Sequence, residues 1–254
     1  MKVYPILVRI GPLEIRTWGL FVMLGFIAGA YWAAREARRS GQNPSFIYDL
    51  TFYIILASII GSRIFFVIEK WGEIFSRNPL KALAVWEGGL IFFGGVILAI
   101  PTAIYFIRKK GLNTWKVGDW IAPGFALGIA IGRIGCFFNG CCFGKPTNLP
   151  WGVIFSPESA AGAQFPGIPI HPTQLYESIG ELIVFFVLLY LRGKKHREGF
   201  LLITFAVLGS LVRFIDDFFR YYEPGAYVLG PLTFNQLISV AIALTAVFLM
   251  ARRR

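Results

Sequence analysis

Long apolar stretches separated by short charged loops run through almost the whole chain. A transmembrane helix needs about 20 mostly apolar residues, and several stretches approach or meet that length. They lie at residues 17–34, 47–68, 88–107, 119–138, 175–191, 199–219 and 231–251. This pattern predicts an all-α polytopic membrane protein with seven transmembrane helices, folded as a single transmembrane domain over residues 1–254.

The composition supports a membrane protein. Hydrophobic residues make up 56% of the 254 residues and charged residues only 15%, whereas a soluble domain has about 45–50% apolar and about 25% charged residues. The first apolar stretch continues too far for the h-region of a signal peptide, so no cleavable signal peptide is expected.

The basic residues indicate the orientation of the helices. The loops after the first, third and fifth stretches and the C-terminal end after the seventh hold fourteen Lys and Arg residues, and the segments on the opposite side hold eight over longer stretches. The positive-inside rule therefore predicts an N-terminus outside and a C-terminus in the cytoplasm. The segment 144–173, rich in Gly and Pro, then forms a long outer loop between spans four and five. The net charge of +11 is mostly this orientation signal, so no nucleic-acid partner is expected.

Three of the 25 basic residues, Arg63, Arg133 and Arg213, fall inside predicted spans. An arginine at mid-bilayer costs at least about 2.5–3.5 kcal/mol on the mildest scales. Each one could snorkel or pair with a carboxylate for a purely structural reason. Because three occur on separate spans at a similar outward depth, we favour the hypothesis that they converge on a shared anionic ligand.

Carboxylates that could pair with these arginines lie on two spans. Arg213, Asp217 and Arg220 are spaced at i, i+4 and i+7, which places them on one helical face. Asp217 either neutralises Arg213 in an intrahelical ion pair or orients it toward a phosphate, and these interpretations are compatible. Glu177 and Glu181 lie one turn apart on the fifth span, where they could also pair with the arginines.

A histidine at the end of the outer loop is a candidate general base. His171 stands in the run Ile170-His171-Pro172-Thr173-Gln174, and loops longer than about 12–15 residues tend to be functional. Its side chain could accept a proton near neutral pH. It could equally cap the fifth span or hydrogen-bond within the loop, and the sequence leaves both roles open.

The only three cysteines are clustered at Cys136, Cys141 and Cys142. Their spacing is not a familiar zinc signature, so no metal site is expected. A disulfide fits an oxidising exterior, a nucleophilic role stays open, and free thiols acting as small apolar residues fit a buried position.

At this point the chain resembles the bacterial prolipoprotein diacylglyceryl transferase family. The resemblance covers essentially the whole chain and is carried by separate motifs in the right order. These are Gly61-Ser62-Arg63-Ile64, Trp86-Glu87-Gly88-Gly89 followed by Gly94-Gly95, Gly132-Arg133-Ile134-Gly135 with Phe137 and Asn139-Gly140, His171 through Glu177, and Arg213 through Arg220.

The resemblance implies transfer of a diacylglyceryl group from phosphatidylglycerol to the lipobox cysteine thiol of a preprolipoprotein. A thioether would form and glycerol phosphate would leave. It implies a multi-pass protein of the bacterial inner membrane that acts without a cofactor as a monomer, with membrane lipid and the prolipoprotein signal peptide as partners. The catalytic residues would be Arg133, Arg213 and His171, and the substrate-binding residues Arg63, Asn139, Gly132, Gly135, Gln174, Tyr176, Glu177 and Asp217.

The chain departs from the family pattern at four positions. Phe93, Cys136, Cys141 and Trp18 stand where the family typically has a histidine, an asparagine, an acidic residue and a tyrosine. A divergent transferase that works by positioning and charge is the favoured interpretation. A paralogue that acts on another phospholipid or acceptor, and a transporter of anionic lipid or solute, are the alternatives.

Overall fold

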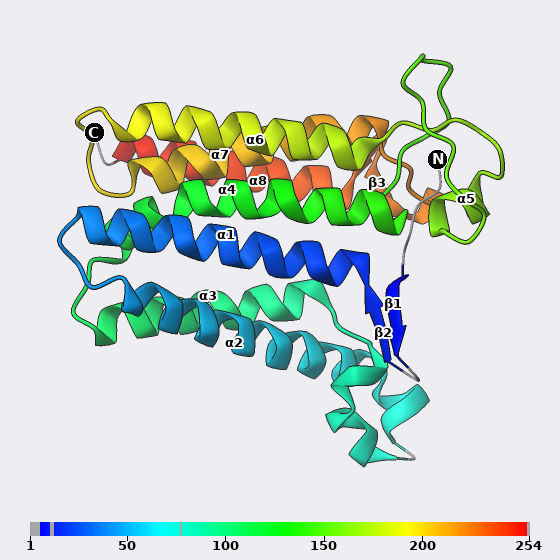
Figure 1. Ribbon diagram of the computed structural model, residues 1–254, viewed down its shortest axis with the longest axis horizontal. Helices are drawn as coiled ribbons and strands as arrows, with labels where there is room; N and C mark the ends of the chain where they lie inside the picture. Colours follow the sequence, from blue (N-terminus) through cyan, green and yellow to red (C-terminus); the bar gives the residue numbers. More distant parts are fainter. Residues whose placement is uncertain (1–5, 11–12, 77, 253–254) are drawn as a thin grey trace. The chain divides into compact units, whose positions relative to one another are not determined.

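The computed structural model describes residues 6–10, 13–76 and 78–252, and these are mostly helical (Figure 1). The α-helices are α1 (Thr17–Arg39), α2 (Ser45–Glu69), α3 (Phe92–Lys109), α4 (Thr114–Asn139), α5 (Ala160–Gln164), α6 (Thr173–Arg192), α7 (Phe200–Phe219) and α8 (Phe234–Arg252). Every predicted span therefore overlaps one long helix, and the seven long helices of the described residues follow the predicted order.

Six of the described helices are long and apolar enough to cross a membrane: α1, α2, α3, α4, α6 and α8. This confirms the prediction of a helical, multi-pass membrane protein. The helix α7 has 20 residues, but Arg213, Asp216 and Asp217 interrupt its apolar sequence. The seventh span and the orientation of the helices stay predictions.

Two predicted spans begin too early. The span predicted from residue 88 begins at Phe92, because Gly88 and Gly89 adopt left-handed φ angles of 85° and 73° that end the preceding turn. The span predicted from residue 231 begins at Phe234, because the residues before it pair in the hairpin of β3 (Tyr227–Leu229) and β4 (Leu232–Thr233).

Short elements that the hydrophobic pattern did not predict lie between the long helices. The strands β1 (Ile6–Ile10) and β2 (Leu13–Arg16) form an antiparallel pair ahead of α1. Single turns of π- or 3₁₀-helix form η1 (Trp71–Phe75), η2 (Pro79–Leu83), η3 (Val85–Glu87) and η4 (Pro224–Ala226). These elements are too short to give a periodic signal in the sequence.

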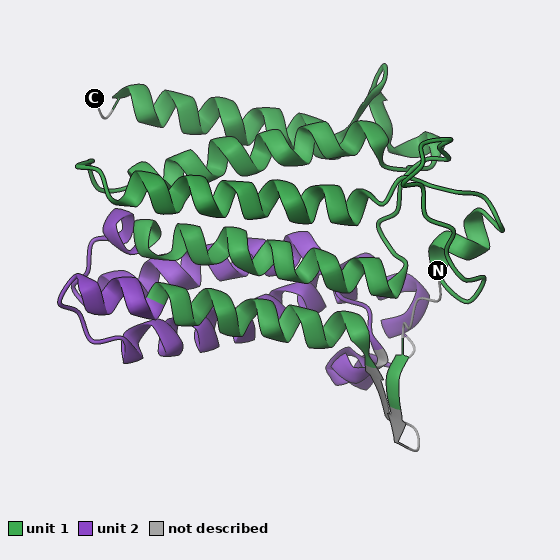
Figure 2. Cartoon of the chain, turned by 45° about the horizontal axis from the view of Figure 1, so that its top comes forward, with its two compact units in different colours: residues 1–33, 118–254 green, residues 34–117 purple. Residues whose placement is uncertain are grey.

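The chain divides into two compact units, residues 1–33 with 118–254 and residues 34–117 (Figure 2). In the second unit α2 packs along α3. In the first unit α6, α7 and α8 pack in sequence order. The expectation of a single transmembrane domain stays a prediction.

Glycines bring α1 and α4 into close contact within the first unit. A Cβ atom on Gly124 would lie 2.5 Å from the carbonyl oxygen of Gly29, and one on Gly25 would lie 2.6 Å from that of Gly128. The glycines of each helix are four residues apart, the small-xxx-small spacing by which membrane helices approach closely. This contact holds α4, which carries Arg133, against α1.

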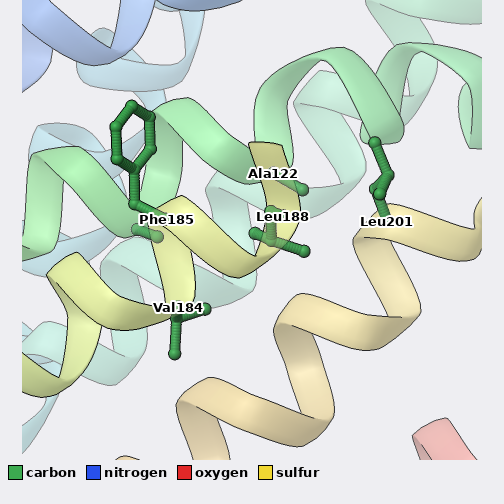
Figure 3. Close-up of a cluster of buried hydrophobic side chains, with 6 residues drawn as sticks. Ala122, Val184, Phe185, Leu188 and Leu201 are labelled. Carbon is green, nitrogen blue, oxygen red and sulfur yellow. The ribbon is translucent and has the colours of Figure 1, made fainter. Parts of the chain in front are cut away.

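A buried apolar cluster joins α4, α6 and α7 in the same unit (Figure 3). Its members are Ala122 and Ala126 of α4, Val184, Phe185 and Leu188 of α6, and Leu201 of α7. Asp119 of α4 accepts hydrogen bonds from the backbone N–H groups of Gly199 and Leu202, at 2.6 and 3.0 Å, and so caps the start of α7. The three helices that carry the charged residues are thereby fixed to one another.

Candidate functional site

Glu177 of α6 is the shared partner of three arginines. Its Oε1 lies 2.8 Å from Nη2 of Arg133 on α4, and its Oε2 lies 3.1 Å from Nη1 of Arg213 on α7. Nη1 of Arg220, at the end of α7, lies 3.9 Å from the same Oε2. One carboxylate therefore draws together guanidinium groups from two helices and a helix end.

A second carboxylate fixes Arg213 from the other side. Asp217 Oδ1 lies 2.8 Å from Nη2 of Arg213, which confirms the predicted ion pair at i and i+4. The Tyr222 hydroxyl accepts a hydrogen bond from Arg213 and donates one to Asp217, at 2.7 and 2.9 Å. Thr233 donates to the other oxygen of Asp217 at 3.0 Å. Burial raises the pKa of Tyr222, so its hydroxyl remains a donor at neutral pH.

The exposure of these groups shows which charges are available to a ligand. The side chains of Glu177 and Asp217 are 5% and 0% exposed, whereas those of Arg133 and Arg213 are 22% and 21% exposed. The carboxylates are thus enclosed, and each of these two arginines keeps part of its guanidinium accessible. These partly exposed guanidinium groups present N–H donors that suit an anion.

Two further buried carboxylates adjoin this group. Both oxygens of Asp216 on α7 and Oε2 of Glu181 on α6 have no hydrogen-bond partner among the described residues. The pairing expected for Glu177 is thus observed, whereas that Glu181 oxygen has no hydrogen bond. Asp216 was not among the predicted site residues, although its spacing of i and i+3 from Arg213 could have indicated it.

His171 lies at a cavity of about 470 Å³ in the first unit. Its Nδ1 is 3.2 Å from the hydroxyl of Tyr176, which also accepts a hydrogen bond from Trp151 Nε1 at 2.8 Å. The cavity is lined by Leu149, Trp151, His171, Tyr176, Gly180, Val212, Ile215, Asp216 and Phe219. The structure therefore brings His171 and Tyr176 to the same cavity as the unpaired carboxylate of Asp216.

Gln174 and Gly135, both expected to bind substrate, have packing roles in the structure. Gln174 is buried, and its Nε2 donates to the carbonyl oxygen of Cys141 at 2.7 Å. Gly135 lies against α1, where an added Cβ would be 2.6 Å from Cβ of Phe21. Gly132, by contrast, has no side-chain or backbone atom within 4 Å of an added Cβ. Asn139 is the half-buried last residue of α4, and a ligand role for all four stays a prediction.

Arg63 has a different set of partners from Arg133 and Arg213. Its guanidinium donates to the carbonyl oxygens of Lys81 at 2.6 Å, Ala82 at 2.8 Å, and Gly88 at 2.6 Å. Arg63 is buried and lies over the rings of Phe66 and Phe75, at 5.5 and 5.6 Å. It thereby ties residues 81–89 to α2 in the second unit. Convergence of Arg63 with the other two arginines on one anion stays a prediction.

Comparisons with known proteins agree with the resemblance found in the sequence. Residues 5–252 match the family model described as prolipoprotein diacylglyceryl transferase. A phosphatidylglycerol–prolipoprotein diacylglyceryl transferase of Solidesulfovibrio magneticus is 38% identical, over 98% of this chain and 94% of its own. Proteins of the same name from Geobacter sulfurreducens and Bordetella parapertussis are each 36% identical, over 98% and 96% of this chain and 96% and 92% of their own.

Replacement of Glu177 by Gln tests its place at the centre of the site. Removing one partner of a buried ion pair costs about 3–5 kcal/mol, and the partial exposure of the arginines places the expected loss toward the lower end. We expect Glu177→Gln to unfold at a clearly lower temperature than the wild type in detergent. Tryptophan fluorescence measures the unfolding.

Glu181→Gln, one turn further along α6, is the matched control because Glu181 Oε2 has no hydrogen bond among the described residues. It should change the unfolding temperature much less. Equal losses in the two variants would show that Glu177 is not the shared anchor of the arginines.

Proposed function

Because the chain belongs to the prolipoprotein diacylglyceryl transferase family, we propose that it transfers a diacylglyceryl group from phosphatidylglycerol to the lipobox cysteine of preprolipoproteins. It is an enzyme of the membrane. The observation that carries the proposal is the group of three arginines around the enclosed carboxylate of Glu177, with part of Arg133 and Arg213 exposed.

The donor headgroup is an anionic phosphodiester, and Arg133 and Arg213 are proposed to bind it. Guanidinium groups recognise phosphate through a planar set of N–H donors. Glu177 and Asp217 use some of these donors and hold the guanidinium planes in place. Such fixed donors need little reorganisation when a phosphate arrives.

The same arginines are proposed to stabilise the leaving group. In the transfer, the thiolate sulfur forms a C–S bond with the glyceryl carbon of the lipid. The C–O bond to the phosphate breaks, and glycerol phosphate leaves with an additional negative charge on its oxygen. Arg133 and Arg213 lower the barrier because they face the group on which this charge develops.

His171 is proposed to accept the proton of the acceptor thiol. In the tautomer that donates from Nδ1 to the Tyr176 hydroxyl, Nε2 is free to take a proton. Burial, with a contribution from Lys145, lowers the pKa of His171, so the ring stays neutral to a lower pH than a free histidine does. Tyr176 and Trp151 then serve to orient the imidazole.

The proposal includes the membrane topology. Seven spans, with α7 among them, would place the N-terminus outside and the C-terminus in the cytoplasm of a bacterial inner membrane. The charges of α7 are compatible with a span because Asp217 and Glu177 neutralise Arg213 within the protein. The outer surface is where a lipid headgroup and an exported lipobox cysteine would meet the site.

A direct assay tests the activity. Purified protein is incubated with phosphatidylglycerol vesicles and a lipobox peptide, and the peptide mass should increase by one diacylglyceryl group. Release of glycerol phosphate in equal amount is expected. If the peptide stays unmodified and proteoliposomes containing the protein show solute flux, the enzyme proposal is wrong and the protein is a transporter.

Arg133→Lys tests phosphate recognition because it keeps the charge and loses the planar donors. We expect a strong loss of transfer activity with normal insertion and yield. Arg38→Lys, at the exposed end of α1, should retain wild-type turnover. Unchanged turnover in Arg133→Lys would show that Arg133 does not bind the phosphate.

His171→Ala tests the proton acceptor through its pH dependence. A free thiol has a pKa of about 8.5, so without a base the rate should fall about tenfold per pH unit below that value. The wild-type rate should fall less, because the lowered pKa keeps His171 neutral to a lower pH than a free histidine. The ratio of wild-type to variant rates should therefore be larger at pH 6.5 than at pH 8.5, within the roughly 10²–10⁴-fold range of base catalysis.

His196→Ala, in the turn between α6 and α7, is the control and should follow the wild-type profile. A constant ratio of wild-type to His171→Ala rates across this pH range would assign His171 a structural role in the loop.

A further inference from the structure

The three cysteines, which the proposed transfer does not use, form one cluster in space. Cys136 lies in the last turn of α4, and Cys141 and Cys142 follow the turn at Gly140. Their sulfur atoms all lie within 4.8 Å of one another. Cys136 is buried and the other two are partly exposed, and all three are free thiols.

The backbone around the cluster is held in an unusual conformation. Cys142 has a φ of 59° and is the only non-glycine residue with positive φ in the described part of the chain. Such a conformation costs an L-residue roughly 1–2 kcal/mol. Two side chains at the start of α6 fix it, since Thr173 donates to the carbonyl oxygen of Cys142 at 2.9 Å and Gln174 to that of Cys141 at 2.7 Å.

The separation of the sulfurs suits a single ion at their centre. With a metal–sulfur distance of about 2.3 Å, three sulfurs around one ion would be about 4 Å apart. A limit of 4.8 Å between all three therefore requires only small side-chain movements. No fourth Cys, His, Asp or Glu donor joins the group among the residues that the structure describes.

The donor set determines the kind of ion. Structural zinc sites almost always have four ligands, whereas soft thiolates select ions such as Cu(I). Three thiolates around one monovalent ion carry two net negative charges. Arg220 and Arg133, which also pair with Glu177, both attract a negative charge on Cys142, and Arg133 also attracts one on Cys136. These attractions offset part of the charge.

We propose that Cys136, Cys141 and Cys142 form a three-coordinate thiolate site for a soft monovalent metal ion of the Cu(I) type. Binding would replace three S–H protons by three metal–sulfur bonds and release the protons to solvent, with no change in oxidation state. The proposal is independent of lipid transfer, because none of the three thiols has a part in it.

The test uses the full-length protein in detergent, reduced and kept under anaerobic conditions. Cu(I) is titrated in competition with a chromogenic Cu(I) chelator, and one ion per chain is expected to be removed from the chelator. X-ray absorption should show three sulfur neighbours. Bound Cu(I) should also protect all three thiols from alkylation, which mass spectrometry measures without any variant.

Variants identify the ligands. Cys136→Ser, Cys141→Ser and Cys142→Ser should each bind Cu(I) more weakly and with only two sulfur neighbours, whereas His171→Ala should retain wild-type binding because no histidine is a ligand. Wild-type binding no stronger than in the triple serine variant, or only two sulfur neighbours in the wild type, would overturn the proposal. It would also be overturned if only one thiol reacted with the alkylating reagent after the protein was denatured without further reductant, because a disulfide that the preparation had not reduced would then join the other two.

Discussion

The site depends on one constraint, which is that the carboxylate of Glu177 is enclosed among apolar helices and must be paired. The free energy needed to bury an isolated ionised carboxylate in such surroundings exceeds the whole folding stability of a typical protein. Arg133, Arg213 and Arg220 satisfy it from α4, from α7 and from the residue that follows α7. The three arginines in turn need its charge, so the pairing fixes the relative positions of the elements that carry them.

The remaining structure of the first unit supports this pairing. The apolar cluster around Leu188 and the cap from Asp119 to α7 hold α4, α6 and α7 together. Tyr222 and Thr233 enclose Asp217 from the segment between α7 and α8. As a result, some N–H groups of the arginines donate to Glu177 and Asp217, and part of the guanidinium surface of Arg133 and Arg213 remains exposed. An anionic headgroup is the type of ligand that this arrangement fits.

Features that depend on local sequence could be predicted. Hydrophobic length predicted the long helices, and the i, i+4 spacing predicted the ion pair of Arg213 with Asp217. Glu177 was recognised as a possible partner because it lies on an apolar span, one turn from Glu181. The family resemblance, confirmed by the match over residues 5–252, identified the same positions from their motifs.

Features that depend on contacts between distant segments could not be predicted. Arg63 donates to main-chain oxygens 18 to 26 residues away, and backbone oxygens leave no signature in a sequence. The spacing of the cysteines did not suggest a metal, because the turn at Gly140 and the positive φ of Cys142 bring their sulfurs together. The role of Asp216 at the cavity likewise follows only from the packing of α7.

The central claim is that Arg133 and Arg213 bind the phosphate of the lipid donor. A structure of the protein with bound phosphatidylglycerol tests it most directly. Phosphate oxygens are expected about 2.7–2.9 Å from guanidinium nitrogens of both arginines, the usual length of such charged hydrogen bonds. A headgroup bound elsewhere, with neither guanidinium within hydrogen-bonding distance of its phosphate, would contradict the claim.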